Sequence, residues 1–226
     1  MNYKLLLIAL LAATLSQAQS FTGSFDLIIT QVYNNGNQRI DSISYYFNET
    51  KTAIIIHAEQ NQPDLRLVFS PADTTITGLF EIKDTKGGYI LPMNEKNWPA
   101  MHYALREYGT GPRTKLNYTG EQKEINGLWC SEINCESEEF EISVWGTNTI
   151  ELTLIQLLAY QTVGAGEDTK AIDMLDKCGI QSFAIETILR GKNDKPDLSL
   201  KVENLSKEVD TTIFSAKGHI LSDMRK

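Results

Sequence analysis

The sequence lacks the residue groupings on which most enzymes and metalloproteins depend. Its three histidines, His57, His102 and His219, lie far apart, and none has a neighbour at the spacing of a metal ligand. It contains neither a Gly-x-Ser-x-Gly nucleophile turn nor a glycine-rich phosphate loop. The acid-rich stretch from Glu132 to Glu141 lacks the regularly spaced Asp or Asn and the glycine of a calcium loop. These absences predict a protein that is not an enzyme and uses no metal or cofactor, with His57 a structural residue of an apolar strand.

Positive charge and cysteine are also scarce. The chain has 21 Lys and Arg against 29 Asp and Glu, a net charge of −8, and no basic stripe, which argues against a nucleic-acid partner. It has three cysteines, Cys130, Cys135 and Cys178, and an odd number allows one internal bridge at most. On a straight strand, Cys130 and Cys135 would be about 16 Å apart, so they can pair only if residues 131–134 form a turn. The sequence leaves a disulfide among the three open, with buried structural cysteines as the alternative.

A long apolar run occurs once, at the beginning of the chain. Lys4 supplies a positive charge, Leu5–Leu15 is apolar except for one threonine, and Ser16 and Ala18 are the small residues of a cleavage site. The run is shorter than the roughly 18 to 20 residues that span a bilayer. The pattern therefore predicts a cleavable leader over residues 1–18 and export of the remainder.

Residues 19–226 are expected to form a single β-rich domain. They contain no internal repeat, no low-complexity tract and no linker, and their length is ordinary for one β-rich unit. No later stretch is long and apolar enough to hold the chain in a membrane, so it is not expected to be an integral membrane protein.

Alternation of apolar and polar residues between short turns predicts most of this domain as strand. Phe25, Leu27 and Ile29 alternate with polar neighbours, and the Asn34–Asn37 turn that follows is typical of a hairpin. Before a terminal segment at 209–214, eleven stretches are predicted as strands: 24–33, 39–48, 52–59, 65–70, 74–83, 89–93, 115–125, 128–135, 140–145, 181–189 and 198–205.

Three helices are predicted among the strands. The main one, Asn148–Tyr160, opens with Asn148 and Glu151 as a capping pair and is apolar nearly all round, which indicates a buried helix. A flat sheet covers only one face of a helix, so we expect a curved sheet around it. Shorter helices are expected at Trp98–Tyr108 and at Lys170–Cys178, where Gly179 ends the helix.

Four segments together resemble the bacterial envelope family called domain of unknown function 4412. They are Phe21–Phe25, Thr119–Cys130, Phe140–Gly146 and Val202–Phe214. In the second, the aromatic residue and the cysteine of the family's Lys-x-Ile-x-Gly-aromatic-x-Cys pattern are adjacent, a departure of one position. The family has no assigned activity, and its members resemble periplasmic lipoprotein carriers.

The resemblance implies a mainly β, α+β fold built on a single strongly curved antiparallel sheet. This open half-barrel of about eleven strands would enclose one buried helix and one or two short helices. It also implies a periplasmic or secreted protein of a Gram-negative bacterium.

The function favoured by these features is a non-enzymatic binding module for a lipid, an acyl chain or another apolar ligand. The ligand would lie between the sheet and the main helix, whose residues Leu154, Leu157 and Leu158 are candidates for a cavity lining. The alternative is a structural or protein-interaction protein of the envelope with a packed core.

Overall fold

The computed structural model describes residues 21–58, 62–105, 117–164 and 169–225, so the predicted leader and the cleavage site before Gln19 lie outside it. The described chain forms one 12-stranded sheet in the order β12-β6-β5-β4-β3-β2-β1-β11-β10-β9-β8-β7. Neighbouring strands are antiparallel except for β12 and β6, which are parallel. The strands are β1 (Gly23–Val32), β2 (Gln38–Phe47), β3 (Thr52–Ile56), β4 (Leu65–Ser70), β5 (Thr75–Ile82), β6 (Thr85–Pro92), β7 (Asn117–Ile125), β8 (Leu128–Glu136), β9 (Phe140–Thr147), β10 (Phe183–Gly191), β11 (Asp197–Ser206) and β12 (Ile220–Asp223).

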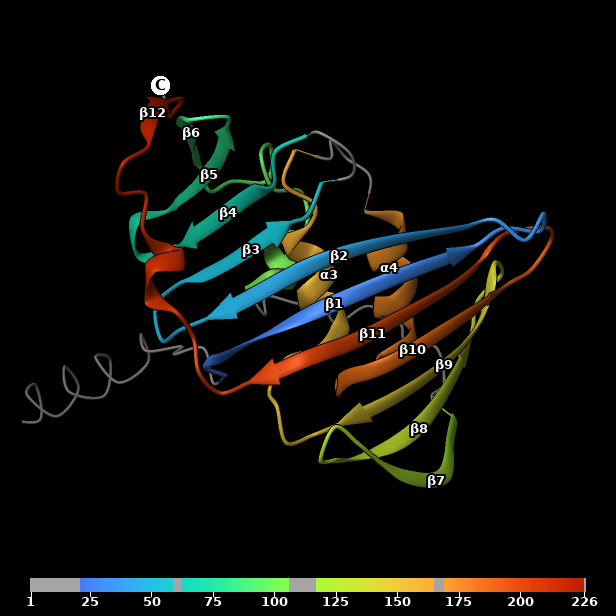
Figure 1. The fold of residues 1–226 in the computed structure, drawn as a ribbon. Helices are drawn as coiled ribbons and strands as arrows, with labels where there is room; N and C mark the ends of the chain where they lie inside the picture. Colours follow the sequence, from blue (N-terminus) through green and yellow to red (C-terminus); the bar gives the residue numbers. More distant parts are fainter. Residues whose placement is uncertain (1–20, 59–61, 106–116, 165–168, 226) are drawn as a thin grey trace, which may run out of the picture.

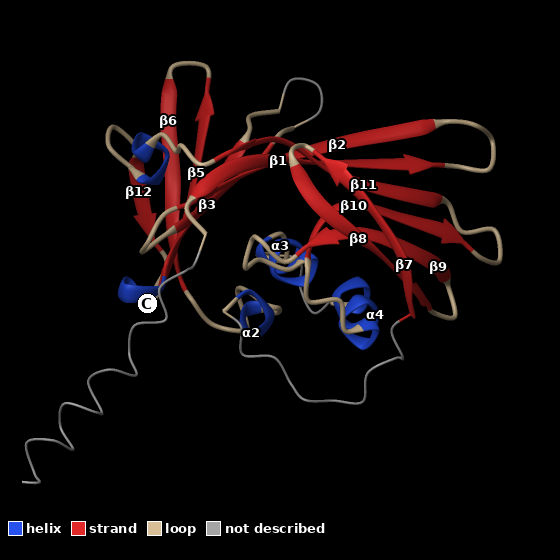
Figure 2. Ribbon diagram, turned by 90° about the horizontal axis from the view of Figure 1, so that it is seen from below, coloured by secondary structure: helices blue, strands red, loops and turns tan. Residues whose placement is uncertain are grey.

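The sheet bends into an open half-barrel, and the helices lie inside the bend (Figure 1, Figure 2). The three α-helices are α2 (Met101–Ala104), α3 (Leu154–Tyr160) and α4 (Lys170–Cys178). The predicted fold class, a single curved and mainly antiparallel sheet around a buried helix, is confirmed. None of the helices in the described part of the chain is both long and apolar enough to cross a membrane.

The main helix is shorter than predicted because its cap lies further along the chain. It begins at Leu154, where Thr153 and Gln156 form a capping box, so the proposed cap at Asn148 was wrong. The pair Leu152 and Leu157, buried with 1% and 0% exposure, occupies the positions of a hydrophobic staple on either side of that box. Thr153 to Gln156 has the same spacing as Asn148 to Glu151, and burial of the flanking leucines favours the later start. The helix is buried as expected, with six of its seven residues inside.

Two other boundaries differ from the predictions. In the predicted helix 98–108 the structure has only α2, and residues 106–108 lie outside the described chain. The terminal segment 209–214 contains the 3-10 turn η2 (Thr211–Phe214), and the chain then adds β12, the twelfth strand, beside β6. Strand β12 has four residues and is mostly exposed, so it lacks the apolar alternation that would have predicted it.

The terminal segment also covers the outer face of the sheet. Ile213, Phe214 and Leu221 pack there against a small cluster formed by Ala53, Val68 and Leu79 on three neighbouring strands. The main hydrophobic core lies on the opposite, concave face, between the sheet and the three helices. The concave face is therefore where a ligand would meet apolar side chains.

Candidate functional site

One end of the concave face is filled by aromatic rings. Phe69 lies 4.6 Å from Trp98 and 4.8 Å from Tyr160, measured between ring centroids. Phe47 is also within the cluster, 6.1 Å from Tyr160. The indole N–H of Trp98 donates a hydrogen bond of 2.7 Å to the carbonyl oxygen of Ala159 at the end of α3. This packing, in which Trp98 and Phe47 are fully buried, leaves no room for a ligand at this end.

The middle of the concave face is anchored to α3 through a buried tyrosine. The Tyr45 hydroxyl donates to the carbonyl oxygen of Leu157 at 2.8 Å and accepts from the side-chain amide of Gln161 at 2.7 Å. Burial raises the pKa of Tyr45 well above its ordinary value, and the Gln161 hydrogen bond offsets only part of that rise. The hydroxyl therefore stays protonated and holds α3 against the sheet.

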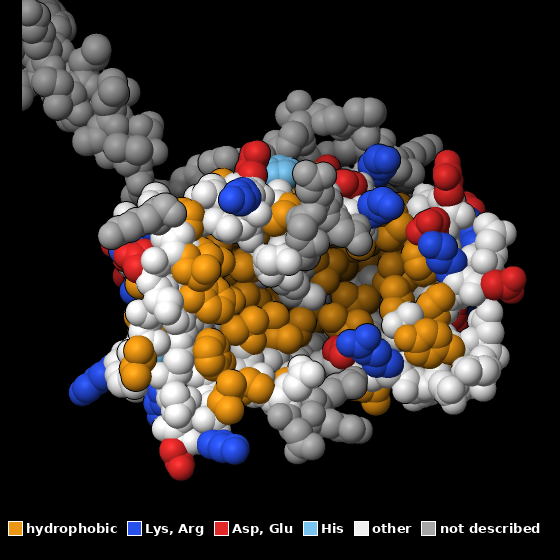
Figure 3. Space-filling model, turned by 90° about the horizontal axis from the view of Figure 1, so that it is seen from above, with side chains coloured by type: hydrophobic (Ala, Val, Ile, Leu, Met, Phe, Trp, Pro, Cys, Tyr) orange, Lys and Arg blue, Asp and Glu red, His pale blue; other side chains and the backbone are white. Residues whose placement is uncertain are grey.

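The other end of the concave face is aliphatic and is incompletely covered by the part of the chain that the structure describes. Ile56 is paired with Ile43 on one side and with Leu65 on the other, so the three side chains form one row across β2, β3 and β4. Ile43 is buried, whereas Ile56 and Leu65 are half-buried, as is Ile29 on β1. Figure 3 shows the end of the half-barrel as a hollow floored by apolar side chains. We call Ile29, Ile56 and Leu65 the aliphatic rim.

Charged residues lie next to the aliphatic rim on the same face. Asp41 is paired with Ile29 and Arg39 with Gln31, which places both side chains on the concave side of β2. The Arg39 guanidinium and the Asp41 carboxylate are 3.0 Å apart. This end of the half-barrel therefore offers an apolar hollow with a polar edge, an arrangement suited to a molecule with an apolar chain and a polar end.

The three leucines proposed as a cavity lining differ in their exposure. Leu154 and Leu157 have 3% and 0% exposure and belong to the packed core. Leu158 is half-buried and packs against the same core. Of the three, Leu158 has appreciable surface left for a ligand. The rim residues were missed in the sequence because each reads there as an ordinary inward position of a strand.

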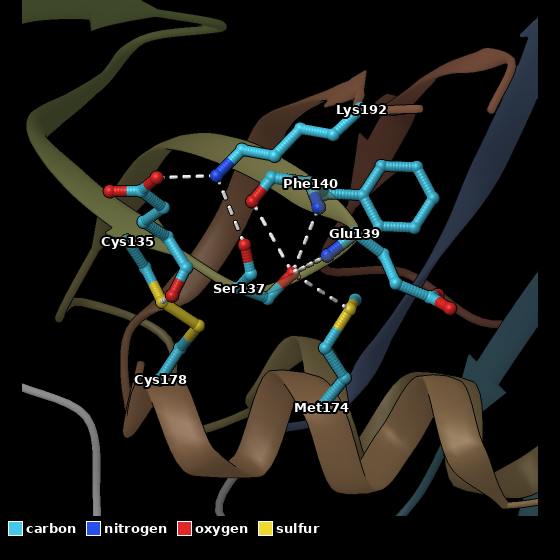
Figure 4. The surroundings of a disulfide bond; sticks show 8 residues. Cys135, Ser137, Glu139, Phe140, Met174, Cys178 and Lys192 are labelled. Carbon is cyan, nitrogen blue, oxygen red and sulfur yellow. Dashed lines mark hydrogen bonds and ion pairs between the residues drawn. A yellow bond between two sulfur atoms is a disulfide. The ribbon is translucent and has the colours of Figure 1, made fainter. Parts of the chain in front are cut away.

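A disulfide bond joins the β7–β9 part of the sheet to α4 (Figure 4). It joins Cys135 on β8 to Cys178 at the end of α4, with the Cα atoms 5.9 Å apart, while Cys130 is free and buried. The pairing that the sequence left open is thus between Cys135 and Cys178, which are 43 positions apart. Burial raises the pKa of the Cys130 thiol, so it is not activated as a nucleophile.

The turn after β8 packs beside the disulfide. The Ser137 hydroxyl accepts hydrogen bonds from the backbone N–H groups of Glu139 and Phe140 and lies 3.4 Å from the Met174 sulfur. Lys192 forms an ion pair with Glu136 and donates to the Ser137 carbonyl oxygen at 3.1 Å. The acid-rich stretch is therefore partly neutralised by lysine. Within the described residues, no cluster of His, Cys, Asp and Glu is arranged to hold a metal ion.

His57 has partners that the sequence did not reveal. Its Nε2 lies 2.9 Å from the Ser44 hydroxyl and its Nδ1 lies 2.9 Å from the Asp64 carboxylate, the order of groups found in serine hydrolases. However, the Ser44 hydroxyl is also 2.5 Å from Asp26, to which it donates, and Ser44 is 6% exposed.

The surroundings of Ser44 do not provide the rest of a hydrolase site. Ser44 is paired with Asp26 on β1 and with Ile55 on β3, so its strand is hydrogen-bonded on both sides and offers no free pair of N–H groups for an oxyanion. We therefore interpret the hydrogen-bonded side chains of Asp64, His57, Ser44 and Asp26 as a tie. This tie holds the β3–β4 connection to the outer face of the sheet. Its members are 7 to 38 residues apart in the sequence, without a recognisable motif.

Comparisons with known proteins give no match in sequence and distant matches in fold. No protein-family model matches the chain, and no curated protein matches it in sequence. The resemblance to domain of unknown function 4412 accordingly stays a prediction. Among solved structures, the one titled PNGF-II in space group P21 has 13% identity and a TM-score of 0.41, covering 89% of this chain and 32% of that one. This chain thus spans about a third of the length of PNGF-II.

Two further solved structures match over nearly their whole length. An uncharacterised conserved protein from Thermus thermophilus has 6% identity and a TM-score of 0.40, covering 98% of this chain and 99% of that one. A LolA superfamily protein from Nitrosomonas europaea has 7% identity and a TM-score of 0.34, covering 86% of this chain and 90% of that one. At these TM-scores the likenesses carry no argument about function, which must come from the site.

Proposed function

We propose that this protein is a non-enzymatic binding module that shelters an apolar chain, such as that of a lipid, at the aliphatic end of its half-barrel. The observation that carries the proposal is the row of half-buried aliphatic side chains on the concave face, Ile29, Ile56 and Leu65. Figure 3 shows apolar side chains gathered in a hollow of the half-barrel. Apolar walls with a few polar groups at one side are typical of small-molecule sites. Each methylene withdrawn from water contributes about 0.8 kcal/mol, so a chain of several methylenes would bind without any specific polar contact.

The proposal includes export of the protein. The apolar run before Ala18 supports removal of residues 1–18 and a working location in the periplasm or outside the cell. The disulfide between Cys135 and Cys178 supports an oxidising compartment, since such bonds persist there and are rare in the cytosol. A carrier of apolar molecules is useful in an aqueous compartment between or beyond membranes.

A structural protein of the envelope is the second candidate. It is favoured by the aromatic end, where Trp98 and Phe47 are fully buried and the half-barrel is as densely filled as an ordinary core. In this alternative the aliphatic end would be the less complete part of the same packing and would bind nothing.

Displacement of a fluorescent fatty acid from the delipidated protein separates the two candidates. We expect saturable binding by the wild type and weakening of at least about tenfold in Ile56→Glu, which places a charge beside the apolar chain. Ile40→Glu is the matched control, because Ile40 is 59% exposed on β2, the strand next to that of Ile56, and is paired with Thr30 on the outer face. Absence of saturable binding by the wild type, or equal weakening by both substitutions, would favour the structural protein.

A further inference from the structure

A second hollow lies on the concave face, away from the aliphatic rim. It is a groove of about 780 Å³ between β7–β9 and the connection from α4 to β10. Trp129, Ser131 and Ile133 alternate along β8 and so face the same side of the sheet. Gln122 is paired with Ser131 and Tyr118 with Ile133, which brings these two β7 residues onto that side as well.

The groove has two aromatic side chains that the fold itself does not need. Trp129 is 68% exposed and Tyr118 is 65% exposed, which is unusual for residues whose rings stabilise proteins chiefly when buried. Tyr118 is paired with Ile133, four positions along β8 from Trp129, so the two residues are attached about 13 Å apart along the strand direction. That spacing suits an extended ligand which offers an apolar surface to each ring in turn.

Apart from Cys130, Ile133 and two glycines, the rest of the lining is polar but uncharged. It contains side-chain amides and hydroxyls and no Asp, Glu, Lys, Arg or His, in a chain in which 22% of residues are charged. The polar members are Gln122, Ser131, Thr147, Asn148, Thr149, Gln181 and Ser182. Such a set both donates and accepts hydrogen bonds but attracts neither anions nor cations, so the ligand should be neutral and rich in hydroxyl groups.

One hydroxyl of the groove lacks a partner. Ser182 is 7% exposed, and its Oγ makes no hydrogen bond to any described residue. It packs against Gly146, where a Cβ would come within 2.2 Å of the Ser182 Oγ, so a glycine is required for the serine to sit there. A buried hydroxyl without a partner is costly, so Ser182 is a polar residue of the groove whose hydrogen-bonding capacity is unused among the described residues.

We propose that this groove binds a neutral oligosaccharide. A sugar ring has a C–H face that packs on an aromatic ring and a rim of hydroxyls that both donate and accept. Trp129 and Tyr118 would each take a ring face, and the amides and hydroxyls between them would bind the rim. The site is separate from the proposed apolar site, because the two share no residue and the groove lies on β7–β9 rather than on β1–β4.

Titration of the mature protein with neutral tetrasaccharides, followed by calorimetry and tryptophan fluorescence, tests the proposal. The probes are the tetramers of β-1,4-glucose, α-1,4-glucose and β-1,4-N-acetylglucosamine, with tetragalacturonate as the charged comparison. We expect saturable binding of at least one neutral probe, with Trp129→Ala and Tyr118→Ala each weakening it about tenfold. Trp129→Phe should retain most of the affinity, because it keeps an aromatic face.

The controls separate binding from folding and from the apolar site. Tyr33→Ala removes a 39% exposed aromatic ring elsewhere and should leave the affinity unchanged, and Trp129→Ala should unfold at the wild-type temperature. Gln122→Ala, also in the groove, should weaken binding whether or not the Trp129 variant folds. The proposal is overturned if no neutral probe binds, if Trp129→Ala and Gln122→Ala both bind like the wild type, or if tetragalacturonate binds as tightly. In the fatty-acid displacement assay, the Trp129→Ala variant should bind like the wild type. A failure of the oligosaccharide proposal is therefore distinguishable from a failure of the apolar-chain proposal.

Discussion

The two ends of the concave face lie on neighbouring strands, but their side chains are covered to different extents. On β2 and β4 the aromatic end has Phe47 and Phe69, both buried with at most 1% exposure, and α2 and α3 close over them. The aliphatic end has Ile56 on β3, the strand between β2 and β4, and Leu65 on β4, both half-buried. The rings of Phe47 and Phe69 meet Trp98 and Tyr160 of α3, which fill the space over the sheet at this end. The difference shows how one sheet can supply a densely packed core at one end and a less completely covered apolar surface at the other.

Truncation of one large side chain at each end gives the largest contrast. Trp98→Ala should lower the free energy of unfolding by about 3 to 5 kcal/mol, because it leaves a cavity among aromatic rings and removes the hydrogen bond to Ala159. Ile56→Ala should lower it by about 1 kcal/mol, since part of that side chain is already in water. Urea unfolding of both variants measures the contrast, and equal losses would mean that the aliphatic end is packed as tightly as the aromatic end.

Breaking the disulfide should have the next largest effect on stability. The bond lies in the β7–β9 part of the sheet, outside both the aromatic and the aliphatic end. The bond joins residues 43 positions apart, for which loss of loop-closure entropy predicts a destabilisation of about 4 kcal/mol, with typical measured values of about 2 to 4 kcal/mol. Thermal unfolding of the Cys135→Ala, Cys178→Ala double variant tests this. The intact denatured protein should also titrate as one free thiol, Cys130, and a count of three would refute the bond.

The smallest effect is expected at the tie that holds the β3–β4 connection next to the aliphatic rim. Burial alone would raise the pKa of Asp64, but the Ala58 N–H and His57 outweigh it and lower that pKa below its ordinary value of 3.8. A carboxyl with a lowered pKa stabilises the fold at pH values above 3.8, and that stability is lost as the pH falls through the lower, folded-state pKa.

Asp64→Asn should therefore cost about 0.3 kcal/mol near pH 7, because the carboxylate is half exposed and screened by solvent. The difference from the wild type should shrink as the pH is lowered below 3.8, as measured by urea unfolding at several pH values. A difference that grows on acidification would have the wrong sign and would show that the tie is not formed by the ionised carboxylate.

The fold was largely predictable because local patterns and long-range packing agree in most of the chain. The alternation of Phe25, Leu27 and Ile29 and the turns around it indicate strands whichever partners they take. Where two local signals compete, as between Asn148 and Thr153 as a helix cap, burial of Leu152 and Leu157 decides, and burial is a property of the folded chain. Strand β12 forms by pairing with the edge of β6, and no pattern in the sequence indicates this pairing.

The sites were less predictable than the fold. Leu154, Leu157 and Leu158 read as one apolar set, yet the first two are core and only the last keeps exposed surface. The groove next to β7 depends on which side of β8 Trp129 faces and on how the α4–β10 connection lies against it. Such relations are set by strand register and by contacts distant in sequence, which periodicity alone does not specify.

Methyl NMR of the delipidated protein during titration with dodecanoic acid tests the central claim most directly. The methyl groups of Ile29, Ile56, Leu65 and Leu158 should shift progressively and saturate together as the chain enters the aliphatic end. Ile76, which is fully buried beside the aromatic end, should not shift. Saturable shifts confined to the first set would support the account, whereas no shifts, or equal shifts throughout the core, would contradict it.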